Sequence, residues 1–373
     1  MRPRTHSNDR PNWIRRAFFV TMAALCIAAA LPVQAADNST DKWTFVSFPD
    51  YFNFDVPNPK PEWEDAIDWH LDQIAAEDPA FCLVAGDLAN AHWWDGPRQI
   101  EHLGNVYYGG WMRRMRDHGL KVYAAIGDHE LGDNPWPPKK AKLKPHFEQA
   151  FIAHLDPPRN GPEGFKGLAY YVRHRNVLVI TVETFEEHDG KILPTVSGRQ
   201  LEWVEETLSE HGPGADFIVV QGHAPILPGV KSRSSSGIML KGGRDSEFWQ
   251  VMKRHGVDLY LCGEHHDITC KEADGIWQVV HGGSWGRKVI PDTNYLRARV
   301  GADRMEVALK EVPLICKGKN IWNIHKSRGP RDIVQISDEA KRKGFQTVGT
   351  VTIEKTADGK KFTNIKGAFA EHQ

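Results

Sequence analysis

Carboxylate and imidazole side chains follow five short apolar runs of this 373-residue sequence. The runs end at Pro49-Asp50, Gly86-Asp87, Gly127-Asp128-His129-Glu130, Gly222-His223 and Gly263-Glu264-His265-His266-Asp267. Such side chains bind Fe, Mn or Zn, and they also donate and accept protons. If the fold brings the five ends together, they would form one polynuclear metal site.

The apolar runs predict buried β-strands, because short apolar stretches closed by Gly or Pro are typical of such strands. Between them lie segments with apolar residues at helical spacing, as in the helix predicted to begin at Pro61. This alternation predicts an α/β fold, in which ligands bind beyond the carboxyl ends of the strands. The predicted strands cover residues 43–48, 81–85, 122–126, 169–172, 177–182, 217–221 and 257–262. The other predicted helices cover residues 97–116, 200–208 and 247–255, and residues 134–145 are predicted to form a loop.

The composition is that of an ordinary globular protein, with 40% apolar and 25% charged residues. The formal charge is −1, but the first 35 residues contain five Arg and one Asp, so the remainder carries −5. A mildly acidic protein offers no electrostatic reason to expect nucleic acid or an anionic membrane as a partner.

The N-terminus predicts a secretory signal peptide over residues 1–35. Arg15 and Arg16 precede the apolar run from Ala17 to Leu31, and small residues allow cleavage after Ala35. The run is too short and too rich in Ala for a stable membrane anchor. We therefore expect an exported, periplasmic or secreted protein. Because the Arg pair resembles a twin-arginine signal, export of the folded, metal-loaded protein is one open route.

Four cysteines remain after cleavage, and their spacing matches no zinc motif. Cys82 and Cys262 lie in apolar strand runs, which favours buried thiols. Export makes a disulfide between Cys262 and Cys270 an alternative.

The order of the five motifs resembles that of the calcineurin-like metallophosphoesterases, a superfamily that includes purple acid phosphatases and exported phosphodiesterases. The resemblance runs from about Trp43 to Gly283 and includes the helix that begins at Gln200. It implies a four-layer αββα sandwich with two mixed β-sheets and metal ligands at the carboxyl ends of strands. We expect a metallophosphoesterase domain over residues 36–310. Beyond about Ala308 Lys and Gly become frequent and short alternating runs appear, so residues 311–373 are expected to form an extension, either a small subdomain or extra strands of the sheet.

Carried over by motif, the resemblance implies a role for each site residue. Asp87 would bridge two metal ions, Asp50 and His266 would hold one of them, and His223 would hold the other. His129 would face the substrate as proton donor or oxyanion stabiliser. A metal-bridged hydroxide would hydrolyse a small phosphomonoester or phosphodiester. The oligomeric state stays open.

The sequence departs from the family pattern at three positions. Phe52 replaces the His of the Asp-x-His motif, and Asn53, Asp55 or Asn90 could compensate for it.

The other two departures replace Asn by Asp128 and His by Glu264, and both new residues are competent metal ligands. Together with Asp50 and Asp87 they make four carboxylates, which could cancel the charge of two divalent ions. Carboxylate and imidazole ligands suit two ions of Fe, Mn or Zn, while the added charge favours the harder ions Mn, Fe(III), Ca or Mg over softer ones. The replacements either tune catalysis or mark a metal- or carbohydrate-binding exported protein with weak or lost catalysis.

Several neighbouring residues have open roles. His265 is expected to point away from the site, although a shifted register with His265 and Asp267 as ligands is an alternative. His281 follows a strand and could contact the substrate. Three cationic side chains near residues 225–243 could bind phosphate, or they could be solvated surface charges. Three loop tryptophans could line a substrate pocket, or they could be hydrophobic anchors under the loops. These six residues are Lys231, Arg233, Arg244, Trp93, Trp94 and Trp136.

Overall fold

The computed structural model describes residues 42–51, 61–89, 93, 95–233, 235–283, 291–317 and 333–371. By its internal contacts the chain divides into two units, Met1–Ser39 and Thr40–Gln373, and all described residues belong to the second. The predicted signal peptide lies outside them. In the part of the chain that the structure covers, no helix is both long and apolar enough to cross a membrane.

A seven-stranded mixed sheet carries the first three predicted strand ends. Its strand order is β17-β16-β13-β12-β1-β2-β3, with β1, β2 and β3 parallel to one another and β12 antiparallel to β1. The strands are β1 (Trp43–Ser47), β2 (Pro79–Ala85), β3 (Val122–Ala125), β12 (Asp292–Val300), β13 (Arg304–Pro313), β16 (Gln346–Thr356) and β17 (Gly359–Gly367).

A six-stranded mixed sheet carries the other two strand ends. Its order is β10-β11-β9-β8-β5-β4, and β5, β8, β9 and β11 run parallel. The strands are β4 (Tyr170–His174), β5 (Val177–Thr181), β8 (Phe217–Gln221), β9 (Leu259–Cys262), β10 (Thr269–Ala273) and β11 (Ile276–Val280). Two large mixed sheets confirm the predicted fold class.

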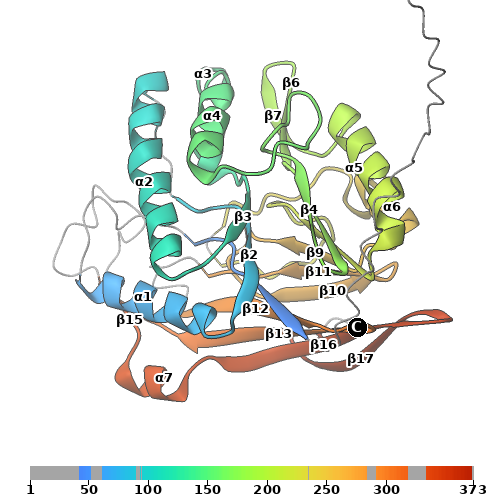
Figure 1. Cartoon of the computed structure of the whole chain (residues 1–373). Coiled ribbons are helices and arrows are strands. Elements are labelled where there is room, and N and C mark those ends of the chain that lie inside the picture. Colours follow the sequence, from blue (N-terminus) through green and yellow to red (C-terminus); the bar gives the residue numbers. More distant parts are fainter. Residues whose placement is uncertain are drawn as a thin grey trace, which may run out of the picture. The chain divides into compact units, whose positions relative to one another are not determined.

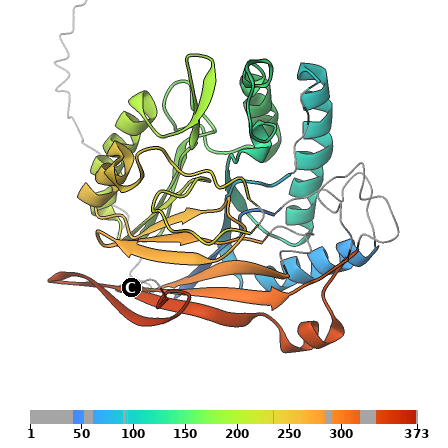
Figure 2. The same ribbon diagram turned by 180° about the vertical axis from the view of Figure 1, so that it is seen from behind.

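The two sheets share one hydrophobic core, and the helices cover a second one. Successive strand residues alternate between the cores, as Phe45 and Val46 do in β1. The helices are α1 (Pro61–Ala75), α2 (Pro97–Asp117), α3 (Pro138–Ala141), α4 (Lys144–Leu155), α5 (Gly198–His211), α6 (Glu247–Arg254) and α7 (Asp338–Lys343). Figure 1 shows α2, α4, α5 and α6 along one margin and the C-terminal strands along the opposite one, and Figure 2 shows the same separation from behind.

Smaller elements complete the described chain. Two short ladders pair β6 (Phe185–His188) with β7 (Lys191–Pro194) and β14 (Ile315–Lys317) with β15 (Ile333–Gln335). Single 3₁₀ turns are η1 (His129–Leu131), η2 (Gly212–Gly214) and η3 (Gly243–Asp245).

The C-terminal residues extend the seven-stranded sheet. β13 spans residues on both sides of the predicted boundary at 310, and β16 pairs with it antiparallel, with Met305 opposite Ile353. β17 then forms the edge of the sheet, next to β16.

One prediction about local structure is wrong, and the prediction of buried thiols at Cys82 and Cys262 is confirmed. Residues 134–145 are not a continuous loop, because α3 and the start of α4 lie within them; Pro138 and Pro145 occupy first turns, where proline is tolerated. The four cysteines after residue 35 are free thiols. Cys262 and Cys270 lie on β9 and β10, and β11 separates these strands, so the alternative disulfide does not form.

Candidate metal centre

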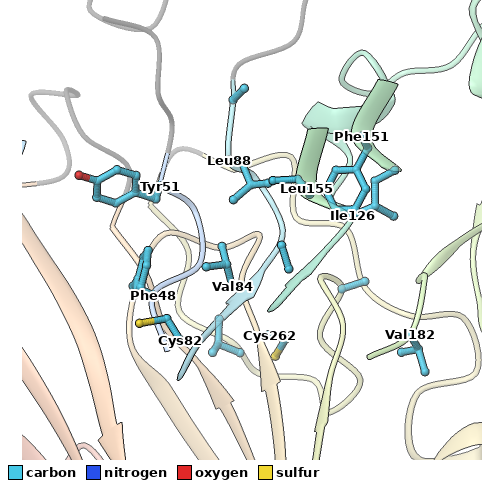
Figure 3. Close-up of a cluster of buried hydrophobic side chains, with 14 of the residues drawn as sticks. Phe48, Tyr51, Cys82, Val84, Leu88, Ile126, Phe151, Leu155, Val182 and Cys262 are labelled. Carbon is cyan, nitrogen blue, oxygen red and sulfur yellow. The ribbon is translucent and has the colours of Figure 1, made fainter. Parts of the chain in front are cut away.

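The carboxyl ends of all five predicted strands lie at the same edge of the fold, where β1, β2 and β3 of one sheet face β8 and β9 of the other. Apolar side chains immediately before and after the polar residues anchor these ends in the core that the helices cover. Figure 3 shows five of them: Phe48, Val84, Leu88, Ile126 and Cys262. The backbone that carries the polar residues is therefore fixed by packing of these apolar neighbours in the core.

The backbone at the site adopts conformations that are uncommon for residues with side chains. Asp50, Asp87, Glu264 and His266 have φ values of 57°, 60°, 71° and 55°. Left-handed backbone at such residues costs about 1–3 kcal/mol each and persists where surrounding structure imposes it. At Gly127 a Cβ atom would lie 2.2 Å from Asp87 Oδ1, so only glycine permits this approach.

One set of ligands surrounds the imidazole of His223. Its Nδ1 donates to the carbonyl of Ala85 at 2.6 Å, which leaves Nε2 as the atom that faces the site. Nε2 lies 3.2 Å from Asp128 Oδ1, 3.4 Å from Asp87 Oδ1 and 3.5 Å from Glu264 Oε2. One nitrogen and three carboxylates therefore converge on one position.

A second set consists of Asp50, Asp87 and His266, whose ligand atoms lie within 4.8 Å of one another. The Nδ1 of His266 donates to the carbonyl of Arg233 at 3.1 Å, and its Nε2 lies 3.8 Å from Asp50 Oδ1. Asp87 belongs to both sets, as expected for a residue that bridges two ions.

The chemistry of these atoms fits bound metal ions. Asp50 Oδ2, Asp87 Oδ2, Asp128 Oδ1 and His223 Nε2 are buried and make no hydrogen bond within the described protein. Burial, reinforced by neighbouring carboxylates, raises the pKa of Asp50 well above its usual value and that of Asp87 to about 7. Cations held among these groups would remove the cost of burying and crowding like charges.

His129 lies at the mouth of the site, with its side chain 13% exposed. Its backbone N–H donates to Asp87 Oδ1 at 3.2 Å, and its Nε2 lies 4.0 Å from both Asp87 Oδ2 and Asp133 Oδ1. Burial opposes protonation, but the carboxylates of Asp87 and Asp128 outweigh it and raise the pKa of His129 to about 9. The side chain also falls in a third possible ligand set, with Asp87 and Asp128.

Glu130 is a site residue to which the sequence analysis assigned no role, although it stands in the Gly-x-His-Glu motif. Its Oε2 accepts hydrogen bonds from the backbone N–H groups of Asp87 (2.7 Å) and Gly127 (2.8 Å). Its Oε1 accepts from those of Leu88 (2.8 Å) and Ala89 (3.2 Å). One buried carboxylate thus connects the loop after β2 to the loop after β3.

Three further residues that the sequence analysis missed hold the two unusual carboxylates. Asn134 Nδ2 donates to Asp128 Oδ2 at 2.9 Å. The hydroxyls of Ser235 and Ser236 donate to Glu264 Oε1 at 2.9 and 2.7 Å. No short motif marks these residues: Asn134 follows Asp128 by six residues, and Ser235 and Ser236 precede Glu264 by 29 and 28 residues.

Other candidate residues lie outside the metal sets. His265 Nε2 hydrogen-bonds to the carbonyl of Ile238 at 3.2 Å, and Asp267 pairs with Arg233 at 2.9 Å. Among the described residues, neither His265 nor Asp267 joins a group of three possible ligands, so the shifted register is not supported. His281 is buried and hydrogen-bonds to Ser47 at 3.0 Å.

The candidate phosphate-binding and pocket residues have structural contacts. Lys231 pairs with Glu371, Arg244 with Asp274, and Arg233 with Asp292 as well as Asp267. Trp93 packs on Tyr107 and Tyr108, and Trp136 packs on Phe185. The remaining candidates lie outside the described residues, and their roles stay predictions: Phe52, Asn53, Asp55, Asn90 and Trp94.

Comparisons with known proteins bear on the family and fold of the chain. A sequence model described as calcineurin-like phosphoesterase matches residues 60–267, more than half of the chain. No curated protein gives a significant match. The solved structure of PhoD covers 89% of this chain and 73% of its own chain at 10% identity, with a TM-score of 0.54, which shows a similar fold. A dimetal phosphatase from Danio rerio covers 71% of this chain and 95% of its own at 14% identity, with a TM-score of 0.49.

Replacement of Glu130 by Gln should destabilise the fold, because the amide NH₂ would face two backbone donors and leave them without an acceptor. Buried donors without partners cost about 1–3 kcal/mol each, so we expect the free energy of unfolding to fall by about 2–6 kcal/mol. Urea unfolding measures this, and Glu101→Gln on the exposed face of α2 is the matched control. Equal stability of wild type and Glu130→Gln would show that these hydrogen bonds do not hold the loops.

Proposed function

Since the chain belongs to the calcineurin-like phosphoesterase family, we propose that it is a metal-dependent phosphoric ester hydrolase acting on a small phosphomonoester or phosphodiester. The observation that carries this proposal is the position of Asp87 between two ligand sets. A shared carboxylate is what two closely spaced catalytic metal ions require.

The six predicted metal ligands divide between two positions. Asp50 and His266 would hold one ion, and Asp128, His223 and Glu264 would hold the other, with Asp87 common to both. Bound Fe, Mn or Zn ions, or Ca as an alternative, would activate water and neutralise charge on the phosphate oxygens. The protein's contribution is to hold the ligands rigidly on strand ends and to exclude bulk water from their buried atoms.

His129 is the residue that we propose to act on the leaving group. Its imidazole is more exposed than the metal ligands, and Asp87 and Asp133 lie near its Nε2. These carboxylates favour the imidazolium form. An imidazolium at the mouth can donate its Nε2 proton to the departing oxygen or stabilise negative charge on the phosphate.

A second candidate function is metal or carbohydrate binding with weak or lost catalysis. The observation that favours it is the surplus of carboxylates around His223, because charge that matches the metal ions lessens the attraction for a phosphate anion. Metal binding without ester turnover would support this candidate.

We also propose that the protein is exported, being periplasmic or secreted. Support comes from the Arg pair, the apolar run and the small residues that end at Ala35.

Three predictions test the proposed function and export. The first concerns turnover of 4-nitrophenyl phosphate and bis(4-nitrophenyl) phosphate by protein supplied with Mn and Fe. His129→Ala should lower kcat at least about 100-fold, because general acid catalysis typically contributes that much. Asp87→Asn should lose both turnover and bound metal. His146→Ala, at an exposed position of α4, is the control. Full activity of both site variants would refute the mechanism.

The second prediction concerns the charge of the substrate. The four site carboxylates match the charge of two divalent ions, so the site should favour the monoanionic diester over the dianionic monoester. Asp128→Asn removes one negative charge and should raise kcat/KM for the monoester, relative to the diester, by about tenfold. The ratio of the two kcat/KM values cancels any general loss of activity. An unchanged ratio would contradict electrostatic control of substrate choice.

The third prediction concerns export. Protein recovered from outside the cytoplasm should begin at Ala36, which intact-mass measurement can establish. If the twin-arginine route is used, replacement of Arg15 and Arg16 by Lys should leave the precursor in the cytoplasm. Recovery of only uncleaved, cytoplasmic wild-type protein would contradict export.

A further inference from the structure

We propose that the position around His223 binds the harder and more highly charged of the two metal ions, and that Asn134, Ser235 and Ser236 are positioning residues for it. This inference rests on the proposed function, since it assumes that both metal positions exist. It concerns which ion each position selects, and which side chains outside the ligand set maintain that choice.

The two departures from the family pattern converge on one position. Asp128 Oδ1 and Glu264 Oε2 lie 3.2 and 3.5 Å from the same atom, His223 Nε2. Among the described residues, and with His129 assigned to the substrate, each proposed metal position has one imidazole and shares Asp87. Beyond these, the described residues supply two further carboxylates to the His223 position and one, Asp50, to the other. Counted over the described residues, the His223 position is therefore richer in negative charge by one carboxylate.

Each added carboxylate has one oxygen held by hydrogen bonds and one oxygen directed at His223. Asn134 holds Asp128 Oδ2, while Ser235, Ser236 and the backbone N–H of Ile238 hold Glu264 Oε1. The free oxygens are thereby fixed in place, and each carboxylate is arranged to offer one ligand atom.

The side-chain amide of Asn134 connects the hydrogen bonds that hold Asp128, here called the clamp on Asp128, with those that hold Glu264, the clamp on Glu264. Asn134 Nδ2 also donates to Ser236 Oγ at 2.9 Å, so the clamp on Asp128 and the clamp on Glu264 share a hydrogen bond. Outer hydrogen bonds of this kind orient ligands, and their loss typically costs 10- to 100-fold in metal affinity. The connection means that the two carboxylates are positioned as one unit.

Charge and ligand type both point to a hard ion here. Oxygen-rich, highly charged sites favour Mn²⁺, Fe³⁺, Mg²⁺ or Ca²⁺, whereas imidazole-rich sites favour Zn²⁺. A trivalent ion at the His223 position and a divalent ion at the other would exceed the charge of the four carboxylates by one. Such a centre would keep some attraction for a monoanionic phosphodiester.

The test is titration of metal-free protein from Ala36 onward with Mn²⁺ alone and with Zn²⁺ alone, by calorimetry or chelator competition. Asp128→Asn combined with Glu264→His restores the residue types usual in the family, and should shift the ratio of Mn²⁺ to Zn²⁺ affinity toward Zn²⁺ by at least about tenfold at one position. Ser235→Ala combined with Ser236→Ala keeps every ligand and should weaken Mn²⁺ binding at that position by about 10- to 100-fold. Ser232→Ala, exposed in the same loop, is the control.

The outcomes separate this inference from the proposed function. Two Mn²⁺ ions in the wild type, with the expected changes in both double variants, support the inference. Two ions in the wild type, with an unchanged Mn²⁺ to Zn²⁺ affinity ratio in the ligand variant and unchanged Mn²⁺ affinity in the serine variant, overturn the inference and leave the proposed function intact. Failure of the wild type to bind either ion overturns both. Because the serine variant alters no ligand, it tests the inference even if the ligand variant fails to fold.

Discussion

The hydrogen bonds accepted by Glu130 determine where Asp87, the proposed bridging carboxylate, can lie. Four backbone N–H groups, from Gly127, Asp87, Leu88 and Ala89, converge on its two oxygens. These groups come from the ends of two adjacent parallel strands, so the two turns cannot move independently. Asp87 follows one strand and His129 the other, and their relative position depends on this single buried side chain.

Close approach of like charges is the second constraint on the site. One buried oxygen of each of Asp50, Asp87 and Asp128 makes no hydrogen bond within the described protein, and burial raises the pKa of the first two. Left-handed backbone at four site residues and glycines without room for a Cβ atom add local strain. Two sheets with a continuous core supply the stability that such a site requires, and bound cations would relieve the repulsion.

Much of the fold could be predicted from local patterns. Apolar runs closed by Gly or Pro correspond to β1, β2, β3, β8 and β9, and the resemblance to one family placed their ends at a common edge. The α4 helix was missed because Pro145 and nearby lysines suggested a loop, although proline is compatible with a first helical turn. The pairing of β16 with β13 could not be read locally, since register depends on which face of each strand is buried.

The sequence by itself determined the candidate ligands, because residue type and position after a strand are local properties. It also showed that Asp128 and Glu264 add carboxylates to the site. Only the tertiary structure decided that Asp128 and Glu264 both lie beside His223 instead of one at each of the two proposed metal positions. Only it revealed Asn134, Ser235 and Ser236 as their partners, since side-chain hydrogen bonds depend on distances and orientations that chain order does not encode.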